Sequence, residues 1–439
     1  MAGSQNATPY RLSIHPSLES FRPELEFACA FVDRCHALDA KANSEKILHY
    51  GPDGPPGAIT VPAVLFPDCV RVDDDGIHPN FDSLTRAEGR LAPPETQLGQ
   101  QRSGALTYDA LGLLFLLLSR LEERDHPNSD RYGRFPIAES LAFRHSDIAN
   151  PLCDDAARAI ASALTGNPAP PSRTTYRVWL THDWDRLRGY HRPWEPLRYA
   201  AGDIVRRRAP GSAAARLRRS YFTGEPWRSL RSILDISERA GHTSHFFFMG
   251  RSDDPMDSPY MLRYPSLARN LSEEIVSRGH AVGFHPGFRT CRDAGEWTRQ
   301  KRDVEEILGQ EIIHGRQHML MFDPERTLDI WDDGGMKMEM TLSYPELPGF
   351  RSGTCRGHAA YSLRRRRTLK LSVLPTAIMD FGFFGGRYRD MSADEAAQEC
   401  QPIIDTCKRT GGDLVVLYHP TQWRDARVRS WYEQVVDSA

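Results

Sequence analysis

Short apolar runs and longer amphipathic segments alternate along the second half of the chain. The apolar runs have the length and composition of buried strands, and they lie at residues 176–182, 243–249, 281–285, 371–379 and 414–419. Segments with apolar positions at helical spacing separate them, at residues 227–240, 265–278, 297–308 and 393–409. Alternating strands and helices predict an α/β fold with a parallel sheet, which is either open or closed into a barrel.

The first 165 residues show a less regular pattern of mixed α/β character. Residues 58–66 (AITVPAVLF) predict a strand, and residues 108–124 and 151–164 predict helices. The segment TGNPAPPSRTT that follows is rich in proline and polar residues, as connectors between domains are. We therefore expect an N-terminal accessory α/β domain at residues 1–165, a linker at 166–175 and a second domain at 176–439.

Composition narrows the classes of partner. The 439 residues are 40% hydrophobic and 26% charged, with a formal net charge of −2, which gives no general attraction to nucleic acid or to an anionic membrane. The most apolar run, ALGLLFLLL, is much shorter than the about 20 residues that cross a bilayer, and it predicts a buried helix. The first residues lack the charged and apolar regions of a signal peptide, so we expect a cytoplasmic protein without a membrane span.

Cysteines and clustered basic residues indicate no specific site. The eight cysteines include no C-x-x-C pair, so the sequence indicates neither a disulfide framework nor a cysteine zinc site. The basic stretches at residues 205–220 and 364–367 are typical of solvated loops, and the alternative is that they bind a phosphate-bearing substrate.

Carboxylates and histidines stand at the ends of three predicted strands. In VWLTHDWDRL an apolar run leads directly to Asp183 and Asp185, and two other runs end in His-Pro, at His285 and His419. Polar side chains at the carboxyl ends of parallel strands build the active sites of α/β barrels, so we expect these four residues at one rim. The alternative at each position is structural: a helix N-cap for the acids and a buried, hydrogen-bonded ring for the histidines.

Two further segments carry candidate chemistry. HGRQHML contains His318 and Arg316, and Arg316 could clamp a carboxylate through two hydrogen bonds or lie in a surface turn. PGFRSGTCRGH places Arg351 among small residues. It also offers Cys355 and His358 as a thiol nucleophile with its base, although free cysteines usually act as small buried hydrophobic side chains.

The succession of these motifs resembles the polysaccharide deacetylase family, also called the nodulation-type deacetylase homology domain or carbohydrate esterase family four. LTHDWD resembles the D-x-D form of its first motif, SRGHAVGFHP its second and LYHP its last, while RQH stands where an Arg-x-Pro motif is usual. The resemblance covers about residues 175–430, and residues 108–124 and 130–143 resemble a region that precedes some of these domains. It implies a distorted (β/α) barrel, one divalent metal ion and hydrolysis of an N-acetyl or O-acetyl group on a sugar.

The resemblance also implies a role for each residue that matches a motif. Asp183 would be the catalytic base, and Asp185 and His285 would bind the metal ion. His419 would be the acid that protonates the departing amine, and Arg316 would hold the catalytic carboxylate.

One position departs from the family pattern. Family enzymes usually have a second metal-binding histidine four residues after the first, where this chain has Arg289. We expect His318 as the replacement. His280 is less favoured because it follows a glycine in a predicted turn, and His182 because the alternation of a strand turns it away from Asp185. Two protein ligands completed by water are the other option. Mixed carboxylate and imidazole ligands suit zinc, which we expect, and also cobalt, nickel, manganese or iron.

These expectations combine into a functional hypothesis. The chain would be a hydrolase of non-peptide C–N bonds that removes an acetyl group from an N-acetylated amino sugar or a similar acetamido substrate, with water activated by the metal as the nucleophile. The substrate would be a nucleotide-linked or lipid-linked sugar precursor, contacted by Arg351 and Trp184. Because Arg289 cannot coordinate a metal, the alternative is a non-catalytic protein that binds a glycan or a sugar nucleotide on the same barrel.

Overall fold

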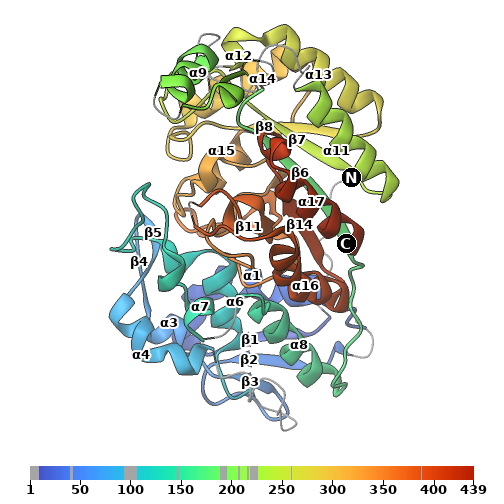
Figure 1. The fold of residues 1–439 in the computed structure, drawn as a ribbon. Helices are drawn as coiled ribbons and strands as arrows, with labels where there is room; N and C mark the ends of the chain where they lie inside the picture. The colour runs from blue at the N-terminus through green and yellow to red at the C-terminus, as the bar shows by residue number, and fades with distance from the viewer. Residues whose placement is uncertain are drawn as a thin grey trace.

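Two larger sheets and two main hydrophobic cores divide the chain into an N-terminal region, up to residue 165, and a C-terminal region from residue 176 (Figure 1). This computed structural model describes residues 9–39, 43–92, 106–145, 148–187, 195–205, 208–214, 217, 226–258, 260–386 and 388–439. The basic stretch at residues 205–220 lies partly outside the described residues. The boundaries of the two domains stay predictions.

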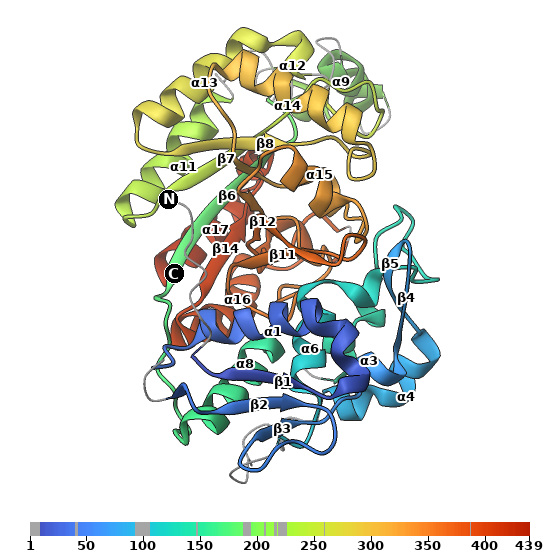
Figure 2. The ribbon, with the colours of Figure 1, turned by 180° about the vertical axis from the view of Figure 1, so that it is seen from behind.

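A parallel three-stranded sheet organises the N-terminal region. Its strands are β1 (Arg11–Ile14), β2 (Ile47–Tyr50) and β3 (Ile59–Val61), in that order. The region also contains α1 (Arg22–Cys35), α3 (Leu65–Asp68), α4 (Phe81–Leu91), α6 (Ala110–Leu118), α7 (Leu141–His145), α8 (Leu152–Thr165) and a hairpin of β4 (Val70–Asp73) and β5 (Gly76–Pro79). Seen from behind, α1 lies between the sheet and strands of the C-terminal region (Figure 2).

Helix α6 shows how a wholly apolar segment is placed. All the residues of ALGLLFLLL are buried, which confirms the predicted buried helix, because a helix that is apolar on every side must lie in a core. Asp109 caps this helix by accepting a hydrogen bond from the Gly112 N–H at 2.7 Å. The same carboxylate accepts from the Leu65 N–H at 2.8 Å, where α3 begins. The strand predicted at 58–66 is therefore wrong in its second half, because this tertiary contact starts a helix there.

A nine-stranded sheet organises the C-terminal region, in the order β11–β12–β10–β9–β8–β7–β6–β14–β13. All neighbouring pairs are parallel except β11 with β12. This arrangement confirms the predicted α/β class. The strands are β6 (Arg177–Trp184), β7 (Ser244–Met249), β8 (Ala281–His285), β9 (His314–Gly315), β10 (Met338–Glu339), β11 (His358–Ser362), β12 (Arg367–Val373), β13 (Ile378–Met379) and β14 (Asp413–Leu417).

The chain after β12 crosses between distant parts of this sheet. The Thr376 N–H donates to the carbonyl of Leu342, just beyond β10, and the Ala377 N–H donates to the carbonyl of Val415 in β14, both at 3.0 Å. Among the described residues, the outermost strands β11 and β13 do not pair with each other. The pairing is that of an open sheet, and the distorted barrel stays a prediction.

Helices cover the sheet where the sequence pattern places them. The four helices predicted in this region are α11 (Trp227–Arg239), α13 (Pro265–Ser277), α14 (Ala294–Leu308) and α16 (Ala393–Thr410), and further helices are α9 (Glu195–Val205), α12 (Tyr260–Arg263), α15 (Thr327–Asp333) and α17 (Ala426–Ser438). Figure 1 shows α11, α13 and α14 near β7 and β8, and α16 and α17 near β14. The strand predicted at 371–379 is two strands, β12 and β13, because the crossing segment separates them. None of the helices in the described ranges is long and apolar enough to cross a membrane.

Ion pairs join the two regions. Nε of Arg356 donates to Oδ1 of Asp154 at 2.7 Å, and both side chains are buried. Arg366, in the basic run at residues 364–367, donates to the buried Glu24 at 2.8 Å. In both pairs the arginine comes from the C-terminal region and the acid from the N-terminal region. Because a buried charge without its partner is costly, these pairs fix the regions against each other.

Candidate active site and metal centre

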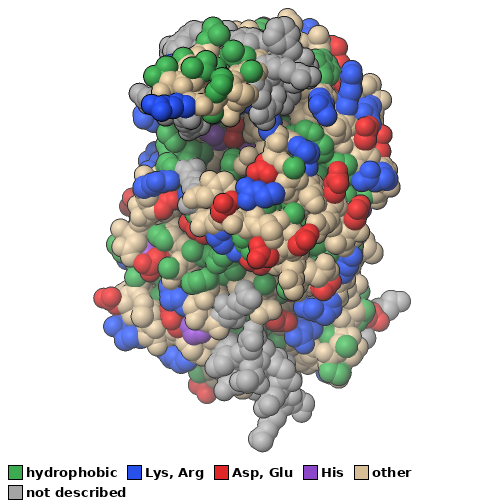
Figure 3. Space-filling view, in the orientation of Figure 1, with side chains coloured by type: hydrophobic (Ala, Val, Ile, Leu, Met, Phe, Trp, Pro, Cys, Tyr) green, Lys and Arg blue, Asp and Glu red, His purple; other side chains and the backbone are tan. Residues whose placement is uncertain are grey.

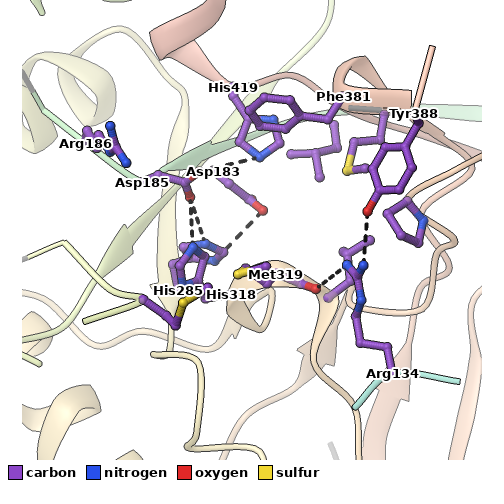
Figure 4. A pocket seen from close by; sticks show the side chains of 15 residues that line it. Arg134, Asp183, Asp185, Arg186, His285, His318, Met319, Phe381, Tyr388 and His419 are labelled. Carbon is purple, nitrogen blue, oxygen red and sulfur yellow. Dashed lines mark hydrogen bonds and ion pairs between the residues drawn. The ribbon is translucent and has the colours of Figure 1, made fainter. Parts of the chain in front are cut away.

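A pocket of about 280 Å³ lies at the carboxyl ends of β6, β8 and β14. Figure 3 shows a hollow with histidine and acidic side chains at its floor, and Figure 4 shows the lining side chains from close by. All four strand-end residues named from the sequence are among them. The polar lining residues are Arg134, Asp183, Asp185, Arg186, His285, His318, Tyr388 and His419, and the apolar ones are Met256, Met319, Leu320, Pro345, Met379, Phe381 and Leu417.

Strand β6 turns its side chains alternately to the pocket and to the core. Asp183 and Asp185 line the pocket. The alternate residues, His182 and Trp184, point to the core. The ring of His182 stacks on Phe246 with centroids 4.5 Å apart, and the indole of Trp184 packs against the same Phe246 ring at 5.6 Å. Trp184 is only 1% exposed. The expectation that Trp184 contacts the substrate is therefore wrong, because the period of the strand points its indole into the core.

Asp185, His285 and His318 each bring one donor atom into a group whose members lie within 4.8 Å of one another. Nε2 of His285 lies 3.2 Å from Oδ1 of Asp185, and Nε2 of His318 lies 3.9 Å from the same oxygen. Figure 4 shows both imidazole rings directed toward Asp185. One carboxylate with two imidazoles is a donor set that suits zinc and other first-row divalent metals.

Hydrogen bonds determine which nitrogen of each ring faces Asp185. Nδ1 of His285 donates to the carbonyl oxygen of Arg316 at 2.6 Å, and Nδ1 of His318 donates to Oδ1 of Asp257 at 2.7 Å. Because these oxygens only accept, Nδ1 of each ring carries a proton. The neutral rings therefore turn the lone pair of Nε2 to the pocket, where a metal ion would bind, and without a metal a protonated His285 donates from Nε2 to Asp185. Outer hydrogen bonds of this kind orient histidine ligands in metal sites. The residues present therefore fit a divalent metal ion.

The charges around Asp185 favour its ionised form. Burial alone would raise the pKa of its carboxyl group, but the hydrogen bond from His285 and the charges of His419 and His318 hold that pKa well below its usual range. Burial by itself lowers the pKa of His285, and the carboxylates of Asp183 and Asp185 raise it overall. An ionised oxygen thus faces the imidazoles near neutral pH, as a metal ligand requires.

Arg316 holds Asp183 in one orientation. Nη1 of Arg316 donates to Oδ1 of Asp183 at 2.7 Å, and both side chains are buried. Its Nη2 donates to the hydroxyl groups of Thr181 and Thr376 at 2.8 Å each, and its Nε donates to the carbonyl of Met340 at 2.9 Å. The guanidinium is thus fixed from three sides, and it fixes the carboxylate at the pocket wall.

His419 is paired with a buried carboxylate. Its Nδ1 donates to Oδ1 of Asp380 at 2.6 Å, and its backbone N–H donates to Oδ2 of Asp380 at 2.8 Å. Burial favours the neutral ring, but Asp380, and after it Asp185 and Asp183, raise the pKa of His419 to about 9. The ring is therefore an imidazolium at neutral pH, and its Nε2 lies 3.9 Å from Oδ2 of Asp185.

Two arginines singled out in the sequence lie away from the pocket. Arg289 is exposed and pairs with Asp254 at 2.8 Å, so this position supplies no ligand. Arg351 is buried, and its Nε and Nη2 donate to the two carboxylate oxygens of Glu123 at 2.8 and 2.7 Å. The expectation that Arg351 contacts the substrate is therefore wrong, because its charge is used to join the two regions.

The thiol alternative has no support in the structure. Cys355 is buried, with Sγ 3.1 Å from the hydroxyl oxygen of Thr410. Its interaction with Cys407, together with burial, raises the pKa of the Cys355 thiol well above its usual range. Neither Cys355 nor His358 lines the pocket. A nucleophilic thiolate is therefore not expected here.

Four residues of the site escaped the sequence analysis. Asp380 directly follows a predicted strand, so the strand-end rule could have found it. Asp257 lies in a loop, and no local pattern marks it. Arg134 and Tyr388 also lie outside helices and strands, and Arg134 belongs to a stretch that the resemblance singled out without assigning it any chemistry.

Comparison with protein families matches residues 27–167 to a family of unknown function, DUF7033. No curated protein matches the chain. Among solved structures, a proposed polysaccharide deacetylase from Mycobacterium smegmatis is 17% identical, over 61% of this chain and 85% of that chain, with a TM-score of 0.40. A family 4 carbohydrate esterase from Streptomyces lividans in complex with acetate is 13% identical, over 60% and 88%, with a TM-score of 0.31. Puue allantoinase is 13% identical, over 71% and 91%, with a TM-score of 0.39. Because these TM-scores are below 0.5, the function has to be argued from the site itself.

Proposed function

We propose that this chain is a metal-dependent hydrolase that removes an acetyl group from an N-acetylated amino sugar or a similar acetamido substrate. An acetamide is a poor electrophile with a poor leaving group, so its hydrolysis needs an activated water, stabilisation of the oxyanion and a proton for the amine. The observation that carries the proposal is that one pocket holds three functional groups that such a reaction needs. These are a cluster of metal-ligating side chains, a carboxylate held by a buried arginine, and a histidine charged by a buried acid.

Asp185, His285 and His318 would hold the metal ion, with zinc as the expected identity and cobalt, nickel, manganese or iron as alternatives. When bound, such an ion supplies a Lewis acid that polarises the carbonyl group and lowers the pKa of water from about 15.7 toward 7. The protein's own part is orientation: the Arg316 carbonyl and the Asp257 carboxylate keep both rings in the tautomer that presents Nε2.

Asp183 would accept the proton of the attacking water. Arg316 binds Oδ1 of Asp183, and Thr181 and Thr376 fix Arg316 in turn, so the carboxylate cannot turn away from the pocket. A positioned base contributes roughly 10²- to 10⁴-fold to a rate. Replacing Asp183 by asparagine keeps the shape of the side chain and removes this contribution.

His419 would give a proton to the departing amine nitrogen. Asp380 accepts from its Nδ1, so the acidic proton that faces the pocket is on Nε2. A pKa of about 9 means that most molecules carry this proton at neutral pH. Asp183 and His419 line the same pocket with opposite charge, which suits one residue to accept a proton and the other to donate one.

One side of the pocket is apolar and suits the acyl group. Leu320, Met379 and Leu417 form a small hydrophobic cluster against which Phe381 packs, and all four line the pocket. The rings of Phe381 and His419 lie 4.4 Å apart between centroids, so this surface adjoins the proposed acid. A volume of about 280 Å³ is at the small end of ligand sites, and it favours one amino-sugar unit, such as that of a sugar nucleotide, over a length of polymer.

The second candidate is a non-catalytic protein that binds a glycan or a sugar nucleotide in this pocket. The observation that favours it is Arg289, which stands where the resembled family has a metal-binding histidine and which pairs with Asp254 instead. The two candidates differ in metal content and in the release of acetate.

Elemental analysis of the purified protein and an acetate-release assay on nucleotide-linked N-acetylamino sugars test the proposal together. We expect near-stoichiometric metal and acetate release in the wild type, and neither in Asp185→Ala. Asp183→Asn should keep the metal and lose at least about 100-fold in activity. Arg289→Ala is the matched control and should keep both, because this side chain is exposed and away from the pocket. A wild type that takes up no divalent metal and releases no acetate, yet binds these sugars, would establish the second candidate instead.

A further inference from the structure

The N-terminal region contributes one side chain to the lining of the pocket, Arg134, as far as the described residues go. Arg134 is 5% exposed and lies on the side of the pocket away from Asp185 (Figure 4). Its hydrogen-bond partners come from three segments: Asp130 in its own loop, Met319 and Tyr388. A guanidinium that bonds two separate lining segments can fix them relative to each other.

The loop that carries Arg134 orients the guanidinium from within the N-terminal region. Oδ1 of Asp130 accepts from the backbone N–H of Arg134 at 2.9 Å, and Oδ2 accepts from its Nε and Nη2 at 2.8 and 2.6 Å. The Asp130 N–H donates back to the Arg134 carbonyl at 2.9 Å, and the guanidinium lies over the ring of Tyr132 at 5.1 Å from its centroid. Contacts within the N-terminal region alone therefore hold the guanidinium in one orientation.

One N–H group of Arg134 reaches a strained turn beside a metal-ligand candidate. Met319 and Leu320 have φ angles of +57° and +55°, and they follow His318 directly. Residues other than glycine are strained in the left-handed conformation, and they persist there where their surroundings hold them. Nη1 of Arg134 donates to the Met319 carbonyl at 3.1 Å, while the side chain of Gln317 anchors the other end of the turn on carbonyl groups after β8.

A second N–H group of Arg134 reaches another lining residue of the pocket. Nη2 donates to the hydroxyl oxygen of Tyr388 at 3.0 Å, and Tyr388 lines the pocket. One side chain of the N-terminal region thus connects the turn at 318–320 with the segment at Tyr388, and the two segments are about 70 residues apart along the chain.

We propose that Arg134 is a positioning residue of the metal centre, which fixes the turn that presents His318, so that the N-terminal region completes the site. This inference rests on the proposed function, because it takes His318 as a metal ligand. His285 ends a strand of the sheet, whereas His318 sits in a turn with two left-handed residues behind it. Metal binding depends on ligand positions to about 0.2 Å, so a small relaxation of the turn changes what His318 can contribute.

Titration of the metal-free protein with Co²⁺, followed by visible absorption, tests this role. Arg134→Met keeps an apolar stem and removes the N–H donors, so we expect the affinity for Co²⁺ to fall about tenfold or more and the absorption bands to shift. The lysine of Arg134→Lys can bond only one of the partners at a time, so the Co²⁺ affinity of this variant should lie between those of the wild type and Arg134→Met. Arg124→Met is the matched control: Arg124 is another buried arginine of the N-terminal region, it bonds Glu325 of the C-terminal region at 3.0 Å, and it does not line the pocket. We expect this control to keep the wild-type affinity and spectrum.

Asp185→Ala separates this inference from the function on which it rests. A wild type that binds no Co²⁺, or binds it as Asp185→Ala does, would overturn the metal site itself. A wild type that binds Co²⁺ beside a folded Arg134→Met with the same affinity and spectrum would overturn only the positioning role. An equal loss in Arg124→Met would also overturn it, because the cause would then be a general loosening between the regions. If Arg134→Met does not fold, the same two readouts on Arg134→Lys decide.

Discussion

Glu339 is a buried carboxyl group near the site, and its effect on stability can be tested without a substrate. It ends β10, is fully buried, and accepts from the Thr341 N–H through Oε1. Its Oε2 has no hydrogen-bond partner in the described parts of the chain. The next residue, Met340, supplies the carbonyl that accepts from Nε of Arg316. The charge of Glu339 therefore acts on the segment that holds the arginine of the proposed base.

The size of the effect follows from the pKa of Glu339. Burial raises the pKa of this carboxyl group from 4.5 to about 7, and the donors of Thr341 and the charges of Arg316 and Arg351 oppose this only in part. A shift of about 2.5 units corresponds to about 3.4 kcal/mol. Because the folded state binds this proton more tightly than the unfolded state, the contribution is fully present below about pH 4.5 and is lost as the pH rises through about 7. Between pH 5 and pH 8 the loss amounts to about 2.5 kcal/mol.

Glu339→Gln resembles the protonated side chain at every pH and removes this dependence. Urea denaturation of the metal-free wild type and variant, at pH 5 and pH 8, measures it. We expect the free energy of unfolding of the wild type to fall by about 2.5 kcal/mol more than that of the variant. The two proteins share all other titrating groups, so the difference isolates Glu339. Equal falls in the two proteins would refute the reasoning, because they would mean that the folded protein solvates this carboxylate.

Other predictions concern the acid, the contact between the regions and the metal ligands. Asp380→Asn removes the charge that raises the pKa of His419 to about 9. The alkaline limb of the pH profile of kcat/KM, where the acid loses its proton, should therefore move to lower pH. An unmoved limb would contradict the assignment of His419 as the acid. Arg351→Met leaves Glu123 buried with one cation fewer and should lower the free energy of unfolding by about 3 kcal/mol in urea while metal content is retained; a loss within error would contradict the importance of this pair. Asp185→Asn should weaken zinc binding, measured by competition with a chelator, by more than the roughly 10- to 100-fold that removal of an outer partner costs, and wild-type affinity would exclude Asp185 as a ligand.

The strand-end residues could be predicted because two patterns coincide in the sequence. β6, β8 and β14 are short apolar runs, and a parallel sheet brings their carboxyl ends to one edge. Local sequence therefore suffices to place Asp183, Asp185, His285 and His419 around one pocket.

The expectations for Trp184 and Arg351 fail for two different reasons. The alternation that turns His182 away from Asp185 applies equally to Trp184. Its place in the strand buries the indole, although a tryptophan at this point of the sequence suggests a sugar contact. Arg351 depends on Glu123, which lies 228 residues earlier in the chain. No local pattern can indicate such a partner, because the contact exists only once the two regions are packed.

Short strands and loops limit what the pattern can reveal of the rest. β9 and β10 have two residues each, too few to show a period, yet β9 leads directly into Arg316. Asp257 orients His318 from a loop, and Arg134 reaches the same turn from the other region. These positions are set by tertiary contacts rather than by local preference.

The arrangement around the two carboxylates at the end of β6 explains how one short motif can serve two roles. Asp183 gives one oxygen to a buried guanidinium, and it could enter a metal's coordination sphere through that oxygen only by leaving Arg316. Asp185 lies instead among imidazole nitrogens, 3.2 Å from His285 and 3.9 Å from His419, and a cation could replace these contacts without leaving an arginine unpaired. The two acids lie two residues apart at the end of β6 and both line the pocket, so the division between proton transfer and metal binding comes from Arg316 rather than from the acids themselves. Exchanging the roles would require the guanidinium to move to Asp185, which its hydrogen bonds to the Thr181 and Thr376 hydroxyls and the Met340 carbonyl oppose.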